Sequence, residues 1–445
     1  MSYVQLFFAP PPNDQKSALE ELISEALPGF KPLKHRTAFL ASPPHIDLDL
    51  LDYCLFLNET LQPNTVKQYL YEINILLNFL ESRGHVWEGL DEQLLRAYRQ
   101  YRMNPASDSA VGERSWRRSG AAIKGFVEFM RIRGRLKNNP APVINGTSVL
   151  APRSRRYPAD IRSISKDRLE RFLRQGLGAF PSHGVATRLR NRTLAELMLK
   201  TGMRISEASN LLTVELNSAR GSNGLIQLEA VAKRQNLRYV TMPVGVMSLL
   251  YTYLKVERAF VVSACQESLR KRSDLFEVSK LAGGVITGIR NGEEFHYRTS
   301  KLPIELRMKA VQRAEDRIEP LGIFIGATTG LPIGPAAWHK VFRQANRQIQ
   351  LHDSTWVPIR SHDFRHTYAS NALAQATALT AQRQSDDASL ALQITTDPLG
   401  MVQRQLGHAS PNTTAQYLRQ PYTADGSLAK AIDQWVSPLA ENGDT

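Results

Sequence analysis

At 445 residues, 42% of them hydrophobic, the chain is too long for one ordinary core and too apolar for a disordered protein, so we expect two or three domains. Lys and Arg number 56 against 42 Asp and Glu, and the net charge of +14 favours a polyanionic partner such as nucleic acid, although acidic membranes attract the same surface. No segment has the roughly 20 apolar residues that cross a bilayer, and the N-terminus lacks the charged start of a signal peptide, so we expect a soluble, cytoplasmic protein with no membrane partner.

Residues 1–43 are predicted to form an N-terminal extension. Two proline-rich patches flank one segment, residues 15–26, whose pattern is that of a helix. The residues assign this extension no role, and an accessory arm is compatible with its composition.

Residues 44–137 are predicted to form a helical domain. Thr65 and Gln68 have the spacing of a capping box, and apolar residues follow at three- and four-residue steps, namely Val66, Leu70, Ile73, Leu77 and Leu80. A later helix is predicted over 112–131. Cys54 and Cys265 both lie in apolar or helical contexts without metal-type spacing, and we expect both cysteines to be structural.

The later helix carries a concentrated basic charge. Residues 111–137 hold eight basic and two acidic side chains. A charge run usually marks a solvated face, but an excess of one sign favours contact with the DNA backbone. The residues that we expect to contact DNA here are Arg114, Arg117, Arg118 and Lys124.

Residues 138–164 are predicted to form a basic interdomain linker. The segment contains several prolines and Asn145-Gly146 but no hydrophobic periodicity. Its cluster of arginines suits a linker that passes along DNA, as it suits any soluble tether, and Arg155 and Arg156 are further candidates for DNA contact.

A second domain is predicted from residue 165 to 437, followed by a tail, 438–445. Its first clear feature is a helix over 187–200 that ends where Gly202 can take the left-handed cap. Ser206 is predicted to cap the next helix, over 207–212. Arg204 is thereby placed in a tight corner, where two packed helices would fix the direction of its side chain.

The middle of this domain mixes strands and helices. A hairpin is predicted over 225–243, with Lys233 at the end of its first strand. A helix over 244–258, a short strand over 323–325 and a helix over 335–350 follow, and we treat residues 259–318 as an insertion.

Two motifs close the domain. His362 and Arg365 stand three positions apart at a predicted helix start, and neighbours at this spacing can address one ligand together. His408 is followed by Ser410 and Pro411, which suit a helix cap and first turn, and then by Tyr417 on that short helix. Alone, each motif is a weak signal, and Tyr417 taken by itself is better interpreted as an ordinary surface or core residue than as a nucleophile.

Taken in order, these motifs resemble the tyrosine site-specific recombinases, the family of phage integrases and chromosome-dimer resolvases. The resemblance covers about residues 45–435 and rests on the stretches 201–207, 362–366 and 406–408, on Tyr417, and on Asn64-Thr65-Val66 and Asn139-Pro140 in the helical domain. It implies a mainly α fold with a small β-sheet (α+β), in which a helical core-site DNA-binding domain and a catalytic domain form a C-shaped clamp around DNA.

The resemblance implies six catalytic residues: Arg204, Lys233, His362, Arg365, His408 and Tyr417. Tyr417 would attack a DNA phosphodiester to give a 3′-phosphotyrosyl linkage, and Arg204 and Arg365 would stabilise the charge on the phosphate oxygens without a metal. His408 would add a hydrogen bond, and His362 would act as general base. Lys233 would protonate the departing 5′ oxygen. Because the ester bond energy is retained, no cofactor or ATP is implied.

Several of these assignments have alternatives. Lys233 adjoins Arg234, and hairpin tips often carry lysine for solubility alone. Tyr422 is a rival nucleophile that lies outside the family spacing. Glu207 either orients Arg204 through a salt bridge or is an acidic first-turn residue favoured by the helix dipole. His366 and Tyr368 are interpreted as core and supporting residues.

The chain departs from the family pattern in two intervals. Lys233 and His362 are 129 positions apart, and His362 and His408 are 46 apart, so we expect insertions near 259–318 and 376–397. Neither insertion removes a catalytic residue, and both indicate a divergent branch associated with mobile elements.

We therefore expect a recombinase that integrates or excises a mobile element. The resemblance implies double-stranded DNA and a homotetramer on two sites as partners, with a last helix over 428–436 docking on a neighbour. Partner recombinases and DNA-bending proteins are further candidates. The alternatives are a type IB topoisomerase, which uses the same chemistry, and a catalytically silent DNA-binding accessory subunit.

Overall fold

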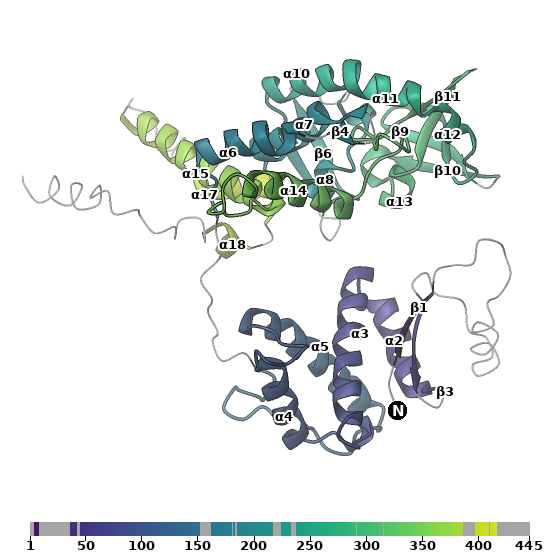
Figure 1. Ribbon diagram of the computed structural model, residues 1–445, viewed down its shortest axis with the longest axis vertical. Helices are drawn as coiled ribbons and strands as arrows, with labels where there is room; N and C mark the ends of the chain where they lie inside the picture. Colours follow the sequence, from purple (N-terminus) through teal and green to yellow (C-terminus); the bar gives the residue numbers. More distant parts are fainter. Residues whose placement is uncertain are drawn as a thin grey trace, which may run out of the picture. The chain divides into compact units, whose positions relative to one another are not determined.

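The computed structural model describes most of the chain, and the chain divides into two compact units, residues 1–158 and 159–445 (Figure 1). The described residues are 4–8, 36–41, 45–151, 162–179, 181–182, 185–216, 224–232, 237–290, 292–314, 316–385, 397–408 and 410–415. Several predictions lie outside them: the helices over 15–26 and 428–436, and the residues Arg155, Arg156, Lys233, Tyr417 and Tyr422.

Unit 1 begins with a small antiparallel sheet that the sequence did not predict. Strand β1 (Val4–Phe8) pairs with β2 (Arg36–Ala41), and β2 pairs with β3 (His45–Ile46). The partners β1 and β2 are separated by a long stretch of chain and lack clear polar–apolar alternation, so only their pairing identifies them as strands.

Residues 48–132 of unit 1 are mostly helical, as predicted, and the described residues that follow, up to 151, are irregular. The main helices are α2 (Leu48–Thr60), α3 (Pro63–Glu81), α4 (Glu92–Met103) and α5 (Glu113–Ile132). They enclose a core in which Trp87, Trp116 and Phe126 are fully buried. The capping box at Thr65 was wrong, because α3 starts at Pro63 and the Gln62 carbonyl already accepts from the Thr65 N–H. Proline suits a first helical position, where no backbone donor is needed.

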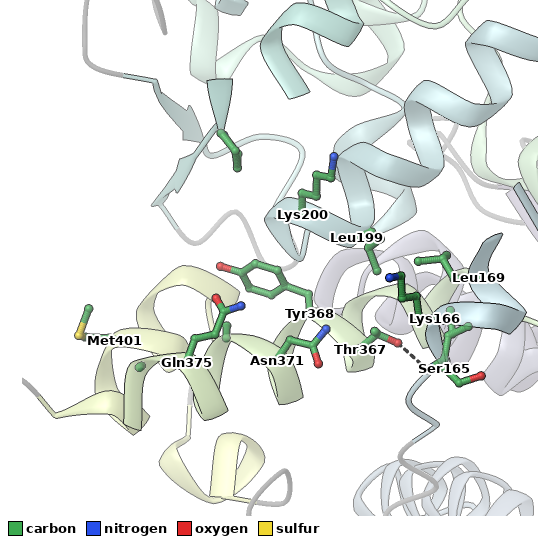
Figure 2. A pocket seen from close by; sticks show the side chains of 14 residues that line it. Ser165, Lys166, Leu169, Leu199, Lys200, Thr367, Tyr368, Asn371, Gln375 and Met401 are labelled. Atoms are coloured by element: carbon green, nitrogen blue, oxygen red, sulfur yellow. Dashed lines mark hydrogen bonds between the residues drawn. The ribbon is translucent and has the colours of Figure 1, made fainter. Parts of the chain in front are cut away.

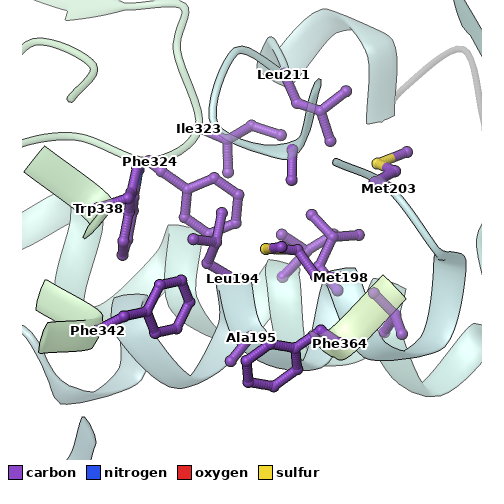
Figure 3. Packing of buried hydrophobic residues seen from close by; sticks show 14 of the residues in the cluster. Leu194, Ala195, Met198, Met203, Leu211, Ile323, Phe324, Trp338, Phe342 and Phe364 are labelled. Carbon is purple, nitrogen blue, oxygen red and sulfur yellow. The ribbon is translucent and has the colours of Figure 1, made fainter. Parts of the chain in front are cut away.

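Unit 2 is built on helices, several of which pack around a large apolar core (Figure 3). They include α6 (Lys166–Arg171), α7 (Arg188–Thr201), α8 (Ile205–Ala208), α10 (Val244–Tyr253), α14 (Pro335–Gln350), α15 (Ser361–Ser385), α17 (Pro398–Leu406) and α18 (Pro411–Ala415). The predicted helix over 335–350 is confirmed, and its Trp338 and Phe342 meet Phe324 and Phe364 in that core. The core thus holds α7, α14 and α15 together.

The described part of unit 2 also holds three sheets, the shortest of which pairs β4 (Pro181–Ser182) with β5 (Val185–Ala186). The predicted hairpin is confirmed as β6 (Leu225–Leu228) paired antiparallel with β7 (Arg238–Thr241). The insertion holds a five-stranded sheet in the order β10-β9-β8-β11-β12, formed by β8 (Phe276–Ala282), β9 (Val285–Arg290), β10 (Glu293–Arg298), β11 (Ala310–Ala314) and β12 (Arg317–Pro320).

The predicted strand over 323–325 was wrong. Only isolated bridges occur there, between Leu212 and Gly322 and between Ile325 and Pro332, and the apolar side chains of this irregular segment fill the core instead. The mainly α fold with small β-sheets is confirmed. No helix among the described residues is long and apolar enough to cross a membrane.

Candidate active site

The corner between α7 and α8 places Arg204. Gly202 ends α7 in the left-handed conformation, with φ of 68°, as predicted. The prediction that Ser206 caps the next helix was wrong: α8 starts at Ile205 with Arg204 as its N-cap. The Glu207 carboxylate takes the capping role, because its Oε2 accepts from the Arg204 N–H at 2.7 Å.

Glu207 also holds the Arg204 side chain. Its Oε1 accepts from Nη1 of Arg204 at 2.8 Å, and the carboxylate is fully buried whereas the guanidinium is partly exposed. The salt bridge foreseen as one role of Glu207 is therefore present. A second cation shares this carboxylate: Nη2 of Arg238, from β7, contacts Oε2.

Arg365 connects the end of α7, at Gly202, with the end of α17, at Leu406. From its buried position in α15 it donates Nη1–H to the carbonyl of Gly202 at 2.6 Å and Nη2–H to the carbonyl of Leu406 at 2.5 Å. The ends of α7 and α17 therefore meet at one guanidinium. His362 lies one turn earlier on α15, exposed to solvent, with its ring edge-to-face against His366 at a centroid distance of 4.5 Å.

His408 is oriented by a short link to α18. It follows Gly407, which ends α17 in the left-handed conformation with φ of 62°. Its Nδ1 lies 2.9 Å from Oγ1 of Thr414, a fully buried residue of α18. Helix α18 begins at Pro411, as predicted, and the chain continues from it toward Tyr417, which lies outside the described residues.

Arg204 and Arg365 both lower the pKa values of His362 and His408. Partial desolvation by the surrounding protein, then His366, Arg365 and Arg204, lower the pKa of His362 to about 4. Desolvation, then Arg365, Arg204, Arg238 and His362, lower the pKa of His408 to about 3. Both imidazoles are therefore neutral near pH 7, beside cations that repel a further positive charge.

The structure thus brings together Arg204, His362, Arg365 and His408, contributed by the N-cap of α8, the start of α15 and the end of α17. Such a set can bind an oxyanion through fixed guanidinium and imidazole donors, with a neutral histidine available to accept a proton. No three His, Cys, Asp or Glu side chains gather as a metal site within the described part of the chain.

Sequence reasoning missed two residues of this cluster, Arg238 and Thr414. Arg238 stands on the inward face of β7 in step with buried Val240, and a charged residue at an inward position was the available signal. Thr414 gave no comparable signal, because its contact depends on how α17 and α18 meet.

A separate pocket of about 950 Å³ lies between α6, α7, α15 and α17 (Figure 2). Lys166, Lys200, Tyr368 and Gln375 are among its lining residues, and none of the four clustered candidates lines it. Tyr368 separates it from the corner, since a Cβ on Gly202 would lie 2.5 Å from the tyrosine ring. The supporting role expected of Tyr368 agrees with this packing.

In unit 1, the basic face of α5 borders a groove of about 830 Å³. Arg117 and Arg118 line it together with Asn64, Gln68 and Tyr71 of α3, and these side chains offer both cations and hydrogen-bonding groups. Lys124 is exposed on the same helix, whereas the side chain of Arg114 is outside the described part of the chain. Two other arginines of the basic run pair instead with α2: Arg133 with Asp52 and Arg135 with Asp49.

The sequence is similar to known families and to curated proteins. A profile of the phage integrase family matches residues 168–381, and a profile of the phage integrase N-terminal SAM-like domain matches residues 48–134. Tyrosine recombinase XerC of Chromohalobacter salexigens is 27% identical over 184 residues, 41% of this chain and 53% of that protein. XerC of Chlamydia pneumoniae is 27% identical over 206 residues, 43% of this chain and 61% of that protein. The chain therefore spans little more than half the length of these relatives.

Solved structures give distant matches over most of the chain. A XerH site-specific recombinase bound to palindromic difH substrate, in a post-cleavage complex, matches with a TM-score of 0.49 and 17% identity, over 88% of this chain and 85% of that one. A Tn1549 transposon integrase in complex with a circular intermediate DNA matches with a TM-score of 0.47 and 14% identity, over 85% and 97%.

Proposed function

The chain belongs to the phage integrase family of tyrosine recombinases, and on that premise we propose that it cleaves and rejoins duplex DNA at specific sites through a 3′-phosphotyrosyl intermediate. The observation that carries the proposal is the convergence of Arg204, His362, Arg365 and His408 from three separate elements. A scissile phosphate is a ligand that suits this set.

In this proposal the two arginines and His408 bind the phosphate. Attack on the phosphorus adds negative charge to the two nonbridging oxygens, and preorganised donors lower the barrier because they need no reorganisation during the reaction. The ion pair with Glu207 supports Arg204 in this role, and the two carbonyl contacts support Arg365. Guanidinium groups suit it better than lysine, since they offer two parallel donors.

Tyr417 is the proposed nucleophile and His362 its general base. The tyrosine hydroxyl loses its proton to the imidazole as it attacks the phosphorus, and the bond from phosphorus to the 5′ oxygen breaks. The neutral state of His362 near pH 7 supports its use as a proton acceptor. Lys233 is the proposed acid that protonates the departing 5′ oxygen, an assignment that rests on the family resemblance.

Double-stranded DNA is the proposed partner, held in part by the groove beside α5 in unit 1. Exposed Arg117, Arg118 and Lys124 support this assignment, since basic side chains on one face favour phosphate contact. We extend the proposal to Arg155 and Arg156, and to a homotetramer on two DNA sites. The large insertion before α14 supports a divergent role in integrating or excising a mobile element.

A nicked duplex that carries the ends of the genetic element encoding the chain provides the test. The nick near the crossover point lets a short strand diffuse away after cleavage and traps the covalent complex. Without metal or ATP, the wild type is expected to form a protein–DNA band that survives denaturant. Tyr417→Phe is expected to lose that band, and Tyr422→Phe, the matched control, is expected to keep it.

The two alternatives give different results. A type IB topoisomerase would form the covalent band and relax supercoiled plasmid without joining strands between two duplexes. An accessory subunit would bind the same DNA and form no band. Loss of the band in Tyr422→Phe rather than in Tyr417→Phe would overturn the assignment of the nucleophile.

A further inference from the structure

Arg238 is a buried cation that contacts the elements around the candidate site. It stands at the start of β7 and is only 6% exposed. Its Nη2 contacts Oε2 of Glu207, and its Nη1 donates to the carbonyl of Gln405 near the end of α17. One planar group therefore joins three elements that are distant in sequence: β7, α8 and α17.

The aliphatic part of the Arg238 side chain is closely packed, as its guanidinium is. A Cβ on Gly407 would lie 2.5 Å from Cδ of Arg238, so the arginine rests directly on the residue that precedes His408. The left-handed φ of Gly407 and this close approach both require glycine there. The backbone that leads into His408 is therefore in direct contact with Arg238.

Glu207 links Arg238 to Arg204, because its carboxylate binds both side chains. Its Oε1 accepts from the Arg204 guanidinium, and its Oε2 accepts from both the Arg204 backbone and Arg238. A buried carboxylate without Arg238 would keep one cation and would be free to turn toward it. The position of Arg204 therefore depends on a charge that sits on a different element.

We propose that Arg238 is a positioning residue for the proposed cleavage reaction, holding Arg204 through Glu207 and His408 through the end of α17 in one fixed arrangement around the phosphate. The inference rests on the proposed function of this site. This role requires an arginine, whose two Nη groups donate to the Glu207 carboxylate and the Gln405 carbonyl at once. A lysine ammonium is a point charge and cannot make both contacts in the same geometry.

The first test compares Arg238→Lys and Arg238→Gln with the wild type on the nicked substrate. Noncovalent DNA binding is expected to stay unchanged, while covalent complex forms about 100-fold more slowly, the order of loss that a misplacement of about 1 Å causes. Arg174→Lys is the matched control, since this arginine is exposed on the surface of the same unit. It is expected to react at the wild-type rate.

A substrate with an uncharged linkage at the scissile position distinguishes loss of the positioning role of Arg238 from a general structural defect. In a methylphosphonate at the scissile position, a methyl group replaces one nonbridging oxygen, so less charge has to be stabilised by Arg204 and His408. The deficit of Arg238→Lys is expected to shrink on this substrate. An equal deficit on both substrates would overturn the positioning role.

A readout independent of activity uses NMR titration of His408 in the DNA-free protein. The groups that lower its pKa are Arg365, Arg204, Arg238 and His362, and Arg238→Lys keeps the charge of all four. A rise of the His408 pKa in this variant would therefore report displacement of the loop. A wild type without any covalent band would refute the proposed function, and the titration would then still show whether Arg238 holds His408 in place. An unmoved titration together with a wild-type cleavage rate would overturn the inference.

Discussion

The imidazole of His408 has a hydroxyl group beside its Nδ1. Thr414 is fully buried, and its Oγ1 lies 2.9 Å from Nδ1 of the imidazole. When the hydroxyl donates to Nδ1, a neutral imidazole carries its proton on Nε2, and Nε2–H is then the donor available to a phosphate. The low pKa of His408 makes this neutral tautomer the state that matters near pH 7.

Replacement of Thr414 by valine is expected to slow the proposed cleavage by about 10- to 100-fold, the usual effect of removing a group that orients a functional histidine. Valine fills a similar volume but lacks the hydroxyl. Covalent-complex formation on the nicked duplex measures the effect, and circular dichroism checks the fold. Thr414→Ser, which keeps the hydroxyl, is the control. Equal losses in the serine and valine variants would show that packing rather than the hydrogen bond is responsible.

The two depressed histidine pKa values also predict a pH dependence of stability. The ordinary value near 6.5 applies to the unfolded chain, while the folded values are about 4 for His362 and about 3 for His408. Below pH 6.5 the unfolded state therefore binds more protons than the folded state. The contribution of these two histidines to the free energy of unfolding is therefore expected to be fully present above pH 6.5 and to be lost as the pH drops toward 4 and then 3.

Urea unfolding at a series of pH values measures the slope of the free energy of unfolding against pH. His362→Gln combined with His408→Gln is expected to flatten it, because neither side chain can then take up a proton on unfolding. His352→Gln, at an exposed histidine after α14, serves as the control and is expected to leave the slope intact. A slope that persists in the double variant would assign the acid sensitivity to other groups.

At the scale of elements, the corner between α7 and α8 depends on Gly202. Its φ of 68° disfavours any residue with a Cβ, and an added Cβ would lie 2.5 Å from the Tyr368 ring and 2.8 Å from Leu406. Gly202→Ala therefore combines a backbone cost of about 1–2 kcal/mol with overpacking of about 1–3 kcal/mol. Because the Gly202 carbonyl accepts from Arg365, the substitution disturbs the candidate site as well.

Chemical denaturation checks this prediction against Gly292→Ala in the same unit. Gly292 also has a left-handed φ, of 82°, but its Cβ position faces open space, so only the backbone cost applies. Gly202→Ala is expected to lower the free energy of unfolding of unit 2 by more than the control does. Equal losses would mean that Tyr368 and Leu406 move aside without cost.

The sequence predicted helices better than strands. Periodicity and terminal signals located α5, α7 and α14 closely, since these are local properties. The sheet of the insertion escaped prediction. Its parallel pair, β8 with β11, is a tertiary property, but the antiparallel pair of β8 and β9 is a local hairpin for which Gly283-Gly284 was an available turn signal. The cap of α8 was misassigned since Ser206 has the better capping propensity, whereas the Glu207 carboxylate reaches back to Arg204.

Among site residues, sequence order was enough to identify the four that the structure describes in one cluster. It was not enough for Arg238, whose partner Gln405 lies 167 positions further along the chain. That contact exists only because β7 packs against α17. The residues that we propose to act on the substrate follow recognisable motifs, while the residue that we propose to hold them in place is identified only by the fold that surrounds it.

At the scale of the whole molecule, the insertion is bonded into the interior of unit 2. Arg307, 1% exposed, donates to the carbonyl of Asn210 at 3.1 Å and pairs with the buried carboxylate of Glu215. Asn210 follows α8 by two residues, so the insertion is tied to the segment that carries Arg204 and Glu207. A removable surface lobe would lack such buried charge contacts, because breaking them leaves unpaired buried groups.

The charge of the molecule leads to a last prediction, on the salt dependence of DNA binding. Part of the +14 net charge is concentrated in residues 111–137, where Arg117 and Arg118 border the groove beside α3. The slope of log affinity against log salt is negative. If both arginines bind phosphates, Arg117→Ala combined with Arg118→Ala reduces the magnitude of this slope by about 0.9 for each phosphate that is no longer neutralised. Fluorescence anisotropy between about 50 and 200 mM salt measures the slope.

Arg83→Ala combined with Arg96→Ala is the control. It removes the same charge from exposed positions in the same unit that do not line the groove, and is expected to change the slope less. Equal slopes for the two double variants would place the DNA-binding surface of unit 1 on another face.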